Sequence, residues 1–191
     1  MKNKGLIIAG VILLLIISVI GSFIGTYNQL QTIDETVNSQ WAQVENQLQR
    51  RSDLIPNLVN TVKGYAAHEK SIFIGVADAR AKLAGAVKQG DIKGINKANA
   101  EFNGSLSRLL AVAENYPQLK ADTNFMALQD EIAGTENRIA VARKDYNDSV
   151  KTINAIIRTF PTSIIAGMSN IKAREYFEVE ESKTAVPEVK F

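Results

Sequence analysis

The 191-residue chain contains no cysteine and a single histidine, His68. Without cysteine, the protein cannot be a lipid-modified lipoprotein, and it cannot use a cysteine nucleophile or a cysteine-ligated metal. With one histidine, it cannot pair two histidine ligands, and the paired Glu-x-x-His motifs of di-metal helical bundles are absent. We therefore expect no catalytic residues, no metal and no cofactor, and we expect that the protein is not an enzyme.

His68 is followed by Glu69, so it could donate a hydrogen bond to a carboxylate or contribute to a site shared with a partner. We interpret it as a residue at the surface or edge of a helical bundle. A glycine-rich phosphate-binding loop is also missing, since GDIKG at residues 90–94 has neither the spacing nor the lysine of a Walker motif. We interpret that segment as a turn.

Proline is scarce, at four residues, whereas helix-forming residues such as Ala, Leu, Gln, Lys and Glu are abundant. This composition is typical of an all-α protein. The formal net charge is +2, and both signs are interspersed along the chain. We therefore expect neither a nucleic-acid-binding face nor a polybasic membrane surface.

The chain has one long hydrophobic run, GLIIAGVILLLIISVIGSFIG at residues 5–25, which contains no charged side chain. In a helix this run spans roughly 30 Å, the thickness of the hydrocarbon core of a bilayer. We predict a retained transmembrane helix; the alternative is a cleaved signal peptide, whose apolar run is usually shorter and ends at a small-x-small site. Lys2 and Lys4 precede the run, whereas Asp34 and Glu35 follow it. The positive-inside rule then predicts a cytoplasmic N-terminus with the rest of the chain outside.

Apolar residues recur at three- and four-residue steps in four later segments, which is the pattern of amphipathic helices. No breaker separates the first segment from the hydrophobic run, so we expect one helix to continue from the bilayer into the body of the protein. The four segments are residues 30–48, 55–83, 95–113 and 125–160. The large residues expected in one common core are Trp41, Leu58, Phe102, Leu128 and Ile139.

Amphipathic helices with short connections pack as antiparallel bundles. Past Pro161 the periodicity is lost and several glutamates follow. The sequence therefore predicts a cytoplasmic N-terminus at residues 1–4, a transmembrane helix at 5–25, an antiparallel (up-and-down) four-helix bundle at 26–160 and an irregular acidic tail at 161–191, in which Tyr176, Phe177 and Phe191 are the expected anchors.

The connection between the first two amphipathic segments falls in RRSDLIPNLV, residues 50–59. Asp53 can cap a new helix and Pro56 can occupy its first turn, so we predict a turn at residues 51–53. Because no glycine is present to reverse the chain, Pro56 could instead only kink one long helix.

Two charged residues stand in the apolar stripe of residues 125–160, where Ile or Leu would be expected. Glu136 and Arg143 occupy these positions. A carboxylate and a guanidinium in a helical bundle could suggest a catalytic or di-metal centre, but the paired motifs of such centres are absent. We predict instead a buried polar network of Arg51, Asp53, Glu136 and Arg143, which favours one helix register more than it favours stability.

Small residues repeat at four-residue spacing within the hydrophobic run. Gly21 and Gly25 form a GxxxG motif, and Ser18 and Ser22 repeat the spacing beside it. Small side chains let helix backbones approach closely in lipid, so this face could associate two helices. The alternative is that glycine and serine are simply common in such helices.

Several motifs follow one another in order along nearly the whole chain. They are Trp41, the residues of RSDLIPNLV at 51–59, Tyr65, His68, Glu69, Ala113, Glu114, Tyr116, Pro117, TENRIAVARKDYN at 135–147, Phe160, Pro161, Tyr176, Phe177, Pro187, Val189 and Phe191. Together with the N-terminal hydrophobic run, they resemble the bacterial LemA family, and only residues 82–99 carry no family motif. The resemblance implies a single-pass bacterial membrane protein with an antiparallel helical bundle.

The resemblance implies little about chemistry, because the family has no well-established molecular activity. One branch serves in building magnetic organelles, and relatives often accompany membrane proteases or other envelope proteins. We therefore expect a non-enzymatic envelope scaffold in the bacterial cytoplasmic (inner) membrane, in contact with lipid, that acts through homo-oligomers and binds no nucleic acid. The alternative is an adaptor or sensor that binds a membrane protease, a peptide or an envelope component.

Overall fold

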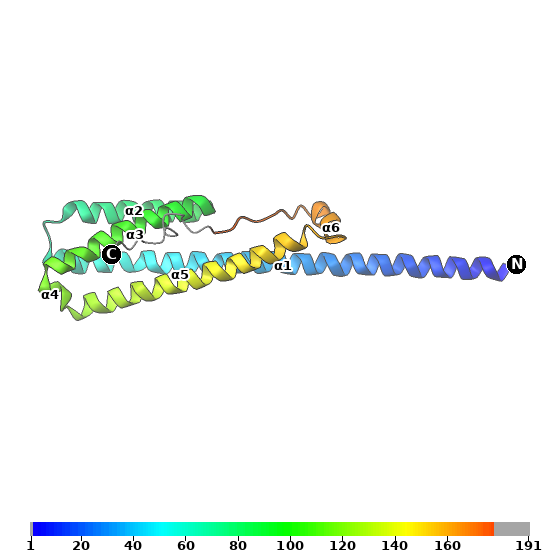
Figure 1. Cartoon of the computed structure of the whole chain (residues 1–191), viewed down its shortest axis with the longest axis horizontal. Helices are drawn as coiled ribbons and strands as arrows, with labels where there is room; N and C mark the ends of the chain where they lie inside the picture. Colours follow the sequence, from blue (N-terminus) through cyan, green and yellow to red (C-terminus); the bar gives the residue numbers. More distant parts are fainter. Residues whose placement is uncertain (1, 178–191) are drawn as a thin grey trace, which may run out of the picture. The chain divides into compact units, whose positions relative to one another are not determined.

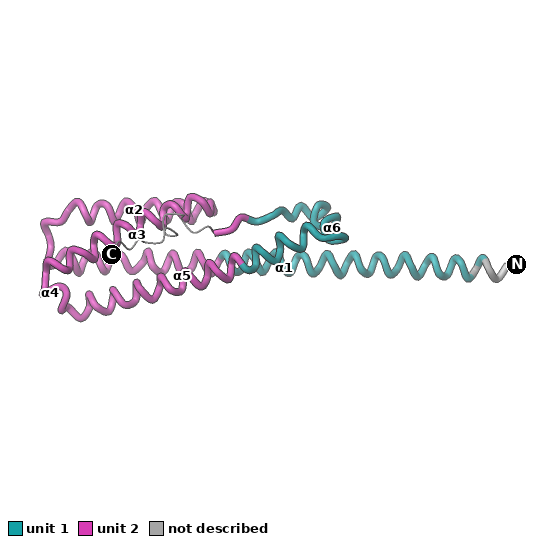
Figure 2. Tube along the Cα trace, in the orientation of Figure 1, with its two compact units in different colours: residues 1–41, 148–174 teal, residues 42–147, 175–191 magenta. Residues whose placement is uncertain are grey.

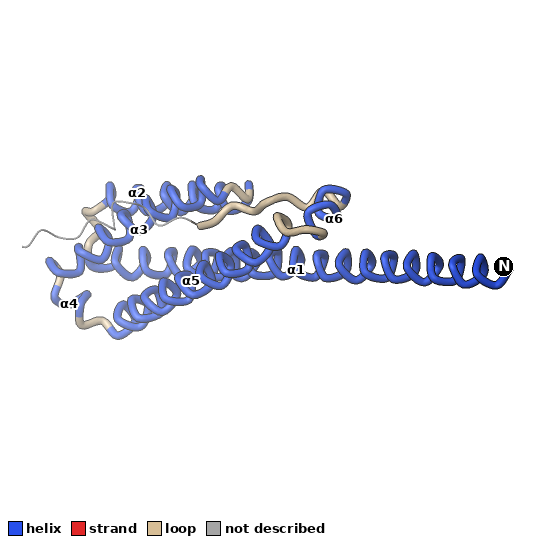
Figure 3. The backbone as a smooth tube through the Cα atoms, turned by 45° about the vertical axis from the view of Figure 1, so that its right-hand side comes forward, coloured by secondary structure: helices blue, strands red, loops and turns tan. Residues whose placement is uncertain are grey.

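The computed structural model describes residues 2–177, and these residues form helices and no strand (Figures 1 and 3). The helices are α1 (Lys2–Tyr65), α2 (Lys70–Gln89), α3 (Ile92–Asn115), α4 (Pro117–Lys120), α5 (Thr123–Ile156) and α6 (Thr162–Met168). The prediction of an all-helical protein with a long apolar N-terminal helix is confirmed. Met1 and residues 178–191, which belong to the expected tail, lie outside the described residues.

The first part of α1 carries the hydrophobic run. Its large apolar side chains between residues 7 and 24 are exposed, and no other described part of the protein covers them. Apolar surface of this extent is not left in contact with water. Among the described helices, α1 is the one long and apolar enough to cross a membrane.

The predicted turn at residues 51–53 is wrong, because α1 continues through Pro56 to Tyr65. Proline has no N–H, so it leaves the carbonyl four residues earlier, that of Ser52, without its partner inside the helix. Arg80 of α2 supplies the missing donor: its Nε donates to the Ser52 carbonyl oxygen and to Ser52 Oγ, both at 3.0 Å. The chain leaves α1 only at residues 66–69.

The described chain divides into two compact units (Figure 2). We call residues 2–41 and 148–174 the anchor unit, and residues 42–147 and 175–177 the body unit. The membrane, body and tail limits expected from the sequence stay predictions.

In the anchor unit, α6 packs on α1 and forms a small apolar core. Leu30 of α1 is buried together with Ile165 and Ala166 of α6, and Ile156, Ile157 and Ile171 pack against them. The prediction that the chain is irregular after Pro161 is therefore wrong for residues 162–168. Seven residues are too few to display a helical period, and the tertiary contact with Leu30 stabilises this helix.

The end of the anchor unit is fastened by Arg174. The side-chain amide of Asn154 donates to the Arg174 carbonyl at 2.9 Å, and the Arg174 N–H donates to Asn154 Oδ1 at 2.8 Å. The guanidinium of Arg174 also donates to Asp34 Oδ1 at 2.8 Å and to Asn38 Oδ1 at 3.2 Å. These contacts tie the segment after α6 to both α5 and α1 within this unit.

In the body unit, side chains from α1, α2, α3 and α5 are buried. Leu58, Phe102 and Ile139 are almost completely buried, as predicted, whereas Leu128 is half-buried. Trp41, the remaining predicted core residue, is half-buried and belongs to the anchor unit.

The body unit also contains the expected turn after α2, in a shorter form than residues 90–94. Gly90 has a φ of 66°, a left-handed conformation that suits glycine, and its N–H donates to the Val87 carbonyl. Asp91 then caps α3 by accepting from the Lys93 N–H at 3.1 Å. The turn therefore ends before Ile92.

Candidate functional site

The predicted polar network centres on an ion pair between α1 and α5. The Arg51 guanidinium donates to a carboxylate oxygen of Glu136 and lies over the Phe102 ring, 5.4 Å from its centroid. Arg51 is 4% exposed, whereas the Glu136 side chain is 43% exposed. Burial lowers the pKa of Arg51, and the charge of Glu136 opposes that shift. The pair therefore joins an enclosed cation to a carboxylate that reaches solvent.

Arg143 lies two helical turns beyond Glu136 on α5. Its guanidinium stacks over the Phe177 ring at 5.2 Å, and its Nε and Nη2 atoms are buried without a hydrogen-bond partner among residues 2–177. Burial lowers the pKa of Arg143; the carboxylate of Glu136 raises it, and the like charge of Arg51 lowers it. Among the described residues, the guanidinium groups of Arg51 and Arg143 therefore both interact electrostatically with the carboxylate of Glu136.

Asp53, the fourth residue of the predicted network, lies outside this cluster. It accepts a hydrogen bond from Gln49 at 2.8 Å and lies 3.8 Å from Arg80. The structure therefore brings Arg51, Glu136 and Arg143 together and places Asp53 beside α2. Arginine stays protonated, so Arg51 and Arg143 contribute fixed positive charge to the cluster.

No group of three or more His, Cys, Asp or Glu side chains in residues 2–177 could hold a metal ion. His68 lies exposed in the connection between α1 and α2.

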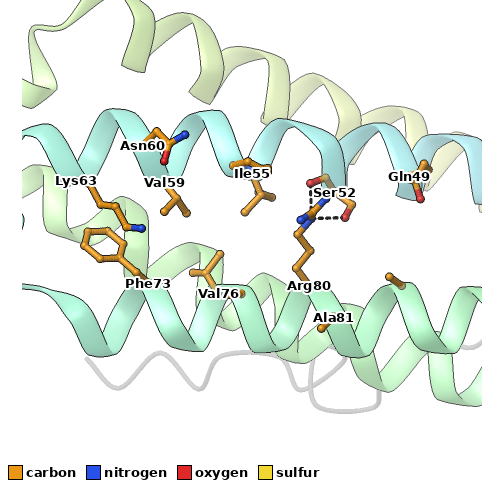
Figure 4. A pocket seen from close by; sticks show the side chains of 13 residues that line it. Gln49, Ser52, Ile55, Val59, Asn60, Lys63, Phe73, Val76, Arg80 and Ala81 are labelled. Carbon is orange, nitrogen blue, oxygen red and sulfur yellow. Dashed lines mark hydrogen bonds between the residues drawn. The ribbon is translucent and has the colours of Figure 1, made fainter.

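A groove of about 470 Å³ lies between α1 and α2 in the body unit (Figure 4). Arg80 crosses it to reach Ser52, and Lys63 Nζ lies 5.3 Å from the centroid of the Phe73 ring. The lining is mostly apolar or small, with two cations and no carboxylate. It consists of Gln49, Ser52, Ile55, Pro56, Val59, Asn60, Lys63, Phe73, Val76, Ala77, Arg80, Ala81 and Ala84.

The predicted association face lies on the apolar part of α1. Ser18, Gly21, Ser22 and Gly25 are all exposed. A Cβ added at Gly21 or Gly25 would meet no atom within 4 Å, so this face is open in the single chain.

Sequence reasoning missed the polar side chains that bind backbone groups or join elements distant in sequence. Asn147 donates to the Phe177 carbonyl and accepts from the Phe177 N–H, both at 2.9 Å, as Asn154 does with Arg174. Phe177 is buried and packs edge-on against Tyr146 at 5.4 Å, whereas Tyr176 is 43% exposed. The available signal was the position of each asparagine beside the mostly apolar stripe of α5. Phe191, the third expected anchor of the tail, lies outside the described residues.

The comparison with known proteins confirms the resemblance. The sequence model of the LemA family matches residues 40–191. Magnetosome protein MamQ 1 of Paramagnetospirillum magneticum and magnetosome protein MamQ of Magnetospirillum gryphiswaldense are each 31% identical over 194 residues, covering 86% of this chain and 71% of the relative. Protein LemA of Metamycoplasma hominis is 22% identical over 159 residues, covering 83% of this chain and 72% of the relative. With its family motifs in order from Trp41 onward, this chain belongs to the LemA family.

Proposed function

We propose that this protein is a non-enzymatic scaffold of the bacterial envelope, tethered by α1 and acting through homo-oligomers. The observation that carries the proposal is the continuity of α1, a single helix from the hydrophobic run to Tyr65. Because α1 is one continuous helix, association of two copies through its apolar part would also bring together the helices that pack on the rest of α1. In this proposal, residues 26–160 form an antiparallel four-helix bundle.

The proposed location is the cytoplasmic membrane, with the N-terminus inside and the bundle outside. Lys2 and Lys4 before the hydrophobic run support this orientation, as do Asp34 and Glu35 after it. A reporter that is active only in the cytoplasm, fused after Phe191, should be inactive. Activity of that reporter would contradict the orientation.

The proposed contact between copies is the face of Ser18, Gly21, Ser22 and Gly25. Its support is the exposure of these small side chains on the apolar part of α1, where close backbone approach costs nothing sterically.

Single cysteines test this contact in native membranes, because the chain has none of its own. Ser22→Cys should form a disulfide-linked dimer on mild oxidation. Phe23→Cys, on the opposite face of the same helix turn, should not. Equal cross-linking at both positions, or none at Ser22, would contradict the proposed face.

A second candidate function, an adaptor, is favoured by the groove between α1 and α2. Lys63, which has no carboxylate beside it in the lining, suits a peptide that carries an acidic residue beside an apolar one. The adaptor predicts a stoichiometric protein partner that is lost in Lys63→Glu and retained in the matched variant Lys70→Glu, whose lysine is exposed outside the groove. Purified oligomers without another protein would favour the scaffold.

A further inference from the structure

The short helix α6 has a second apolar face, which nothing in the described chain covers. Its inner face, Ile165 and Ala166, packs on Leu30. On the outside, Phe160 is 82% exposed, Ile164 57% and Met168 72%. Ile164 and Met168 stand four residues apart, so they lie along one side of α6, and Phe160 precedes the helix by two residues; we call these three residues the apolar row. An apolar row of this kind next to a folded core marks an interaction surface.

The position of α6 in the anchor unit indicates what covers this row. Leu30, on which α6 packs, follows Gly25 by five residues, or about 7.5 Å along the helix axis. The headgroup region of a bilayer extends about 5–8 Å beyond the hydrocarbon core on each side. Figures 1 and 3 show α6 beyond the end of α5, on the side of the apolar part of α1.

The charged residues in the segment around α6 are all positive. Between residues 149 and 174 there is no Asp or Glu, but four cations are present: Lys151, Arg158, Lys172 and Arg174. Arg158 and Lys172, which flank the row, are exposed, whereas Arg174 is paired with Asp34. Anionic lipid headgroups complement such a segment, while the apolar side chains supply most of the contact.

We propose that the row formed by Phe160, Ile164 and Met168 lies in the headgroup region of the membrane that α1 spans, as a second lipid contact of the anchor unit. The inference rests on the proposed anchoring of α1. Its consequence is that the anchor unit is held to the bilayer at two places, which fixes its tilt and rotation.

Nitroxide labels on single cysteines test the proposal in the full chain, reconstituted in vesicles of phosphatidylethanolamine and phosphatidylglycerol. Labels replace Ile164 and Met168, whose side chains are exposed and do not form the core with Leu30. Leu14→Cys reports on the anchor itself, and Ala155→Cys, exposed on α5, is the matched aqueous control. Collision with dissolved oxygen measures contact with lipid, and collision with a water-soluble nickel chelate measures contact with water.

The proposal predicts that labels at Ile164 and Met168 collide severalfold less with the nickel chelate than the label at Ala155, and more with oxygen. Equal nickel access at Ile164, Met168 and Ala155, with Leu14 in lipid, would overturn the lipid contact and leave the anchor intact. Low collision with both reagents at Ile164 would also overturn it, because a protein surface would then cover the row. Water access at Leu14 would overturn the anchor, and with it the proposed function.

Discussion

At the scale of single residues, the structure depends on polar side chains that satisfy backbone groups or charges on another helix. Arg80 replaces the hydrogen bond that Pro56 removes from Ser52. Asp122 caps α5 by accepting from the Phe125 N–H at 2.9 Å, and it also accepts from the hydroxyl of Tyr65, at the end of α1, at 2.9 Å. Unsatisfied buried groups are costly, so these residues help to decide which helices pack together.

The role of Arg80 predicts a coupling with Pro56. Arg80→Ala should lower the free energy of unfolding by about 1–2 kcal/mol, because the Ser52 carbonyl loses its donor. In a Pro56→Ala background the helix regains its own N–H donor, so the same substitution should cost about 1 kcal/mol less. Urea unfolding of the full chain in detergent measures both values. Additive effects would show that Arg80 does not compensate for the proline.

Asp122 predicts a dependence of stability on pH. The N–H of Phe125, and then the hydroxyl of Tyr65, lower the pKa of Asp122, while the hydrogen bond to Asp122 raises the pKa of Tyr65. A lowered carboxyl pKa stabilises the fold above the unfolded value of about 4, and this contribution is lost as the pH falls through the folded pKa. The stability difference between the parent and Asp122→Asn should therefore shrink on acidification. A difference that stays constant between neutral and acidic pH would contradict this role.

The hydrogen bond between Tyr65 and Asp122 also affects stability at alkaline pH. Because the folded pKa of Tyr65 is raised, its contribution to stability is present below about pH 10 and is lost above it.

At the scale of elements, periodicity predicted the long helices but neither the short ones nor every connection. The stripes at residues 95–113 and 125–160 correspond to α3 and α5, because the periodicity of each stripe persists over many turns. The predicted turn near Pro56 was wrong because Arg80, which donates the hydrogen bond that proline cannot, lies on the next helix, α2. In the same way, Glu136 and Arg143 stood out against their apolar stripe, whereas nothing local distinguished Asp53 from residues in the cluster.

The clamp at Asn154 predicts a local effect on the segment after α6. Asn154→Leu keeps the branched shape of the side chain but removes both hydrogen bonds to the Arg174 backbone. At about 0.5–1.5 kcal/mol for each bond, amide hydrogen exchange at residues 171–174 should accelerate about tenfold. Thr152→Leu, an exposed position on the same helix, is the control and should leave exchange unchanged. Equal rates in the parent and Asn154→Leu would contradict the clamp.

At the scale of the whole molecule, the sequence indicated a membrane anchor joined to a helical body, and α1 is long and apolar enough to cross a membrane. The division into an anchor unit and a body unit was not predicted, because α1 and α5 each contribute to both units without a break in their pattern. Nor could periodicity predict α6, whose inner face finds its partner at Leu30, more than a hundred residues earlier in the chain. Long-range contacts of this kind leave no period in the sequence.

We propose that copies of this chain assemble through the face of Ser18, Gly21, Ser22 and Gly25 on α1. The most direct test is the native mass of the detergent-extracted full chain, compared with that of the double variant Gly21→Leu, Gly25→Leu and of Ala9→Leu on the opposite face. We predict an oligomer for the parent and for Ala9→Leu, and a monomer for the double variant, because leucine keeps the helix backbones apart. A monomeric parent, or a double variant with the same mass as the parent, would contradict the claim.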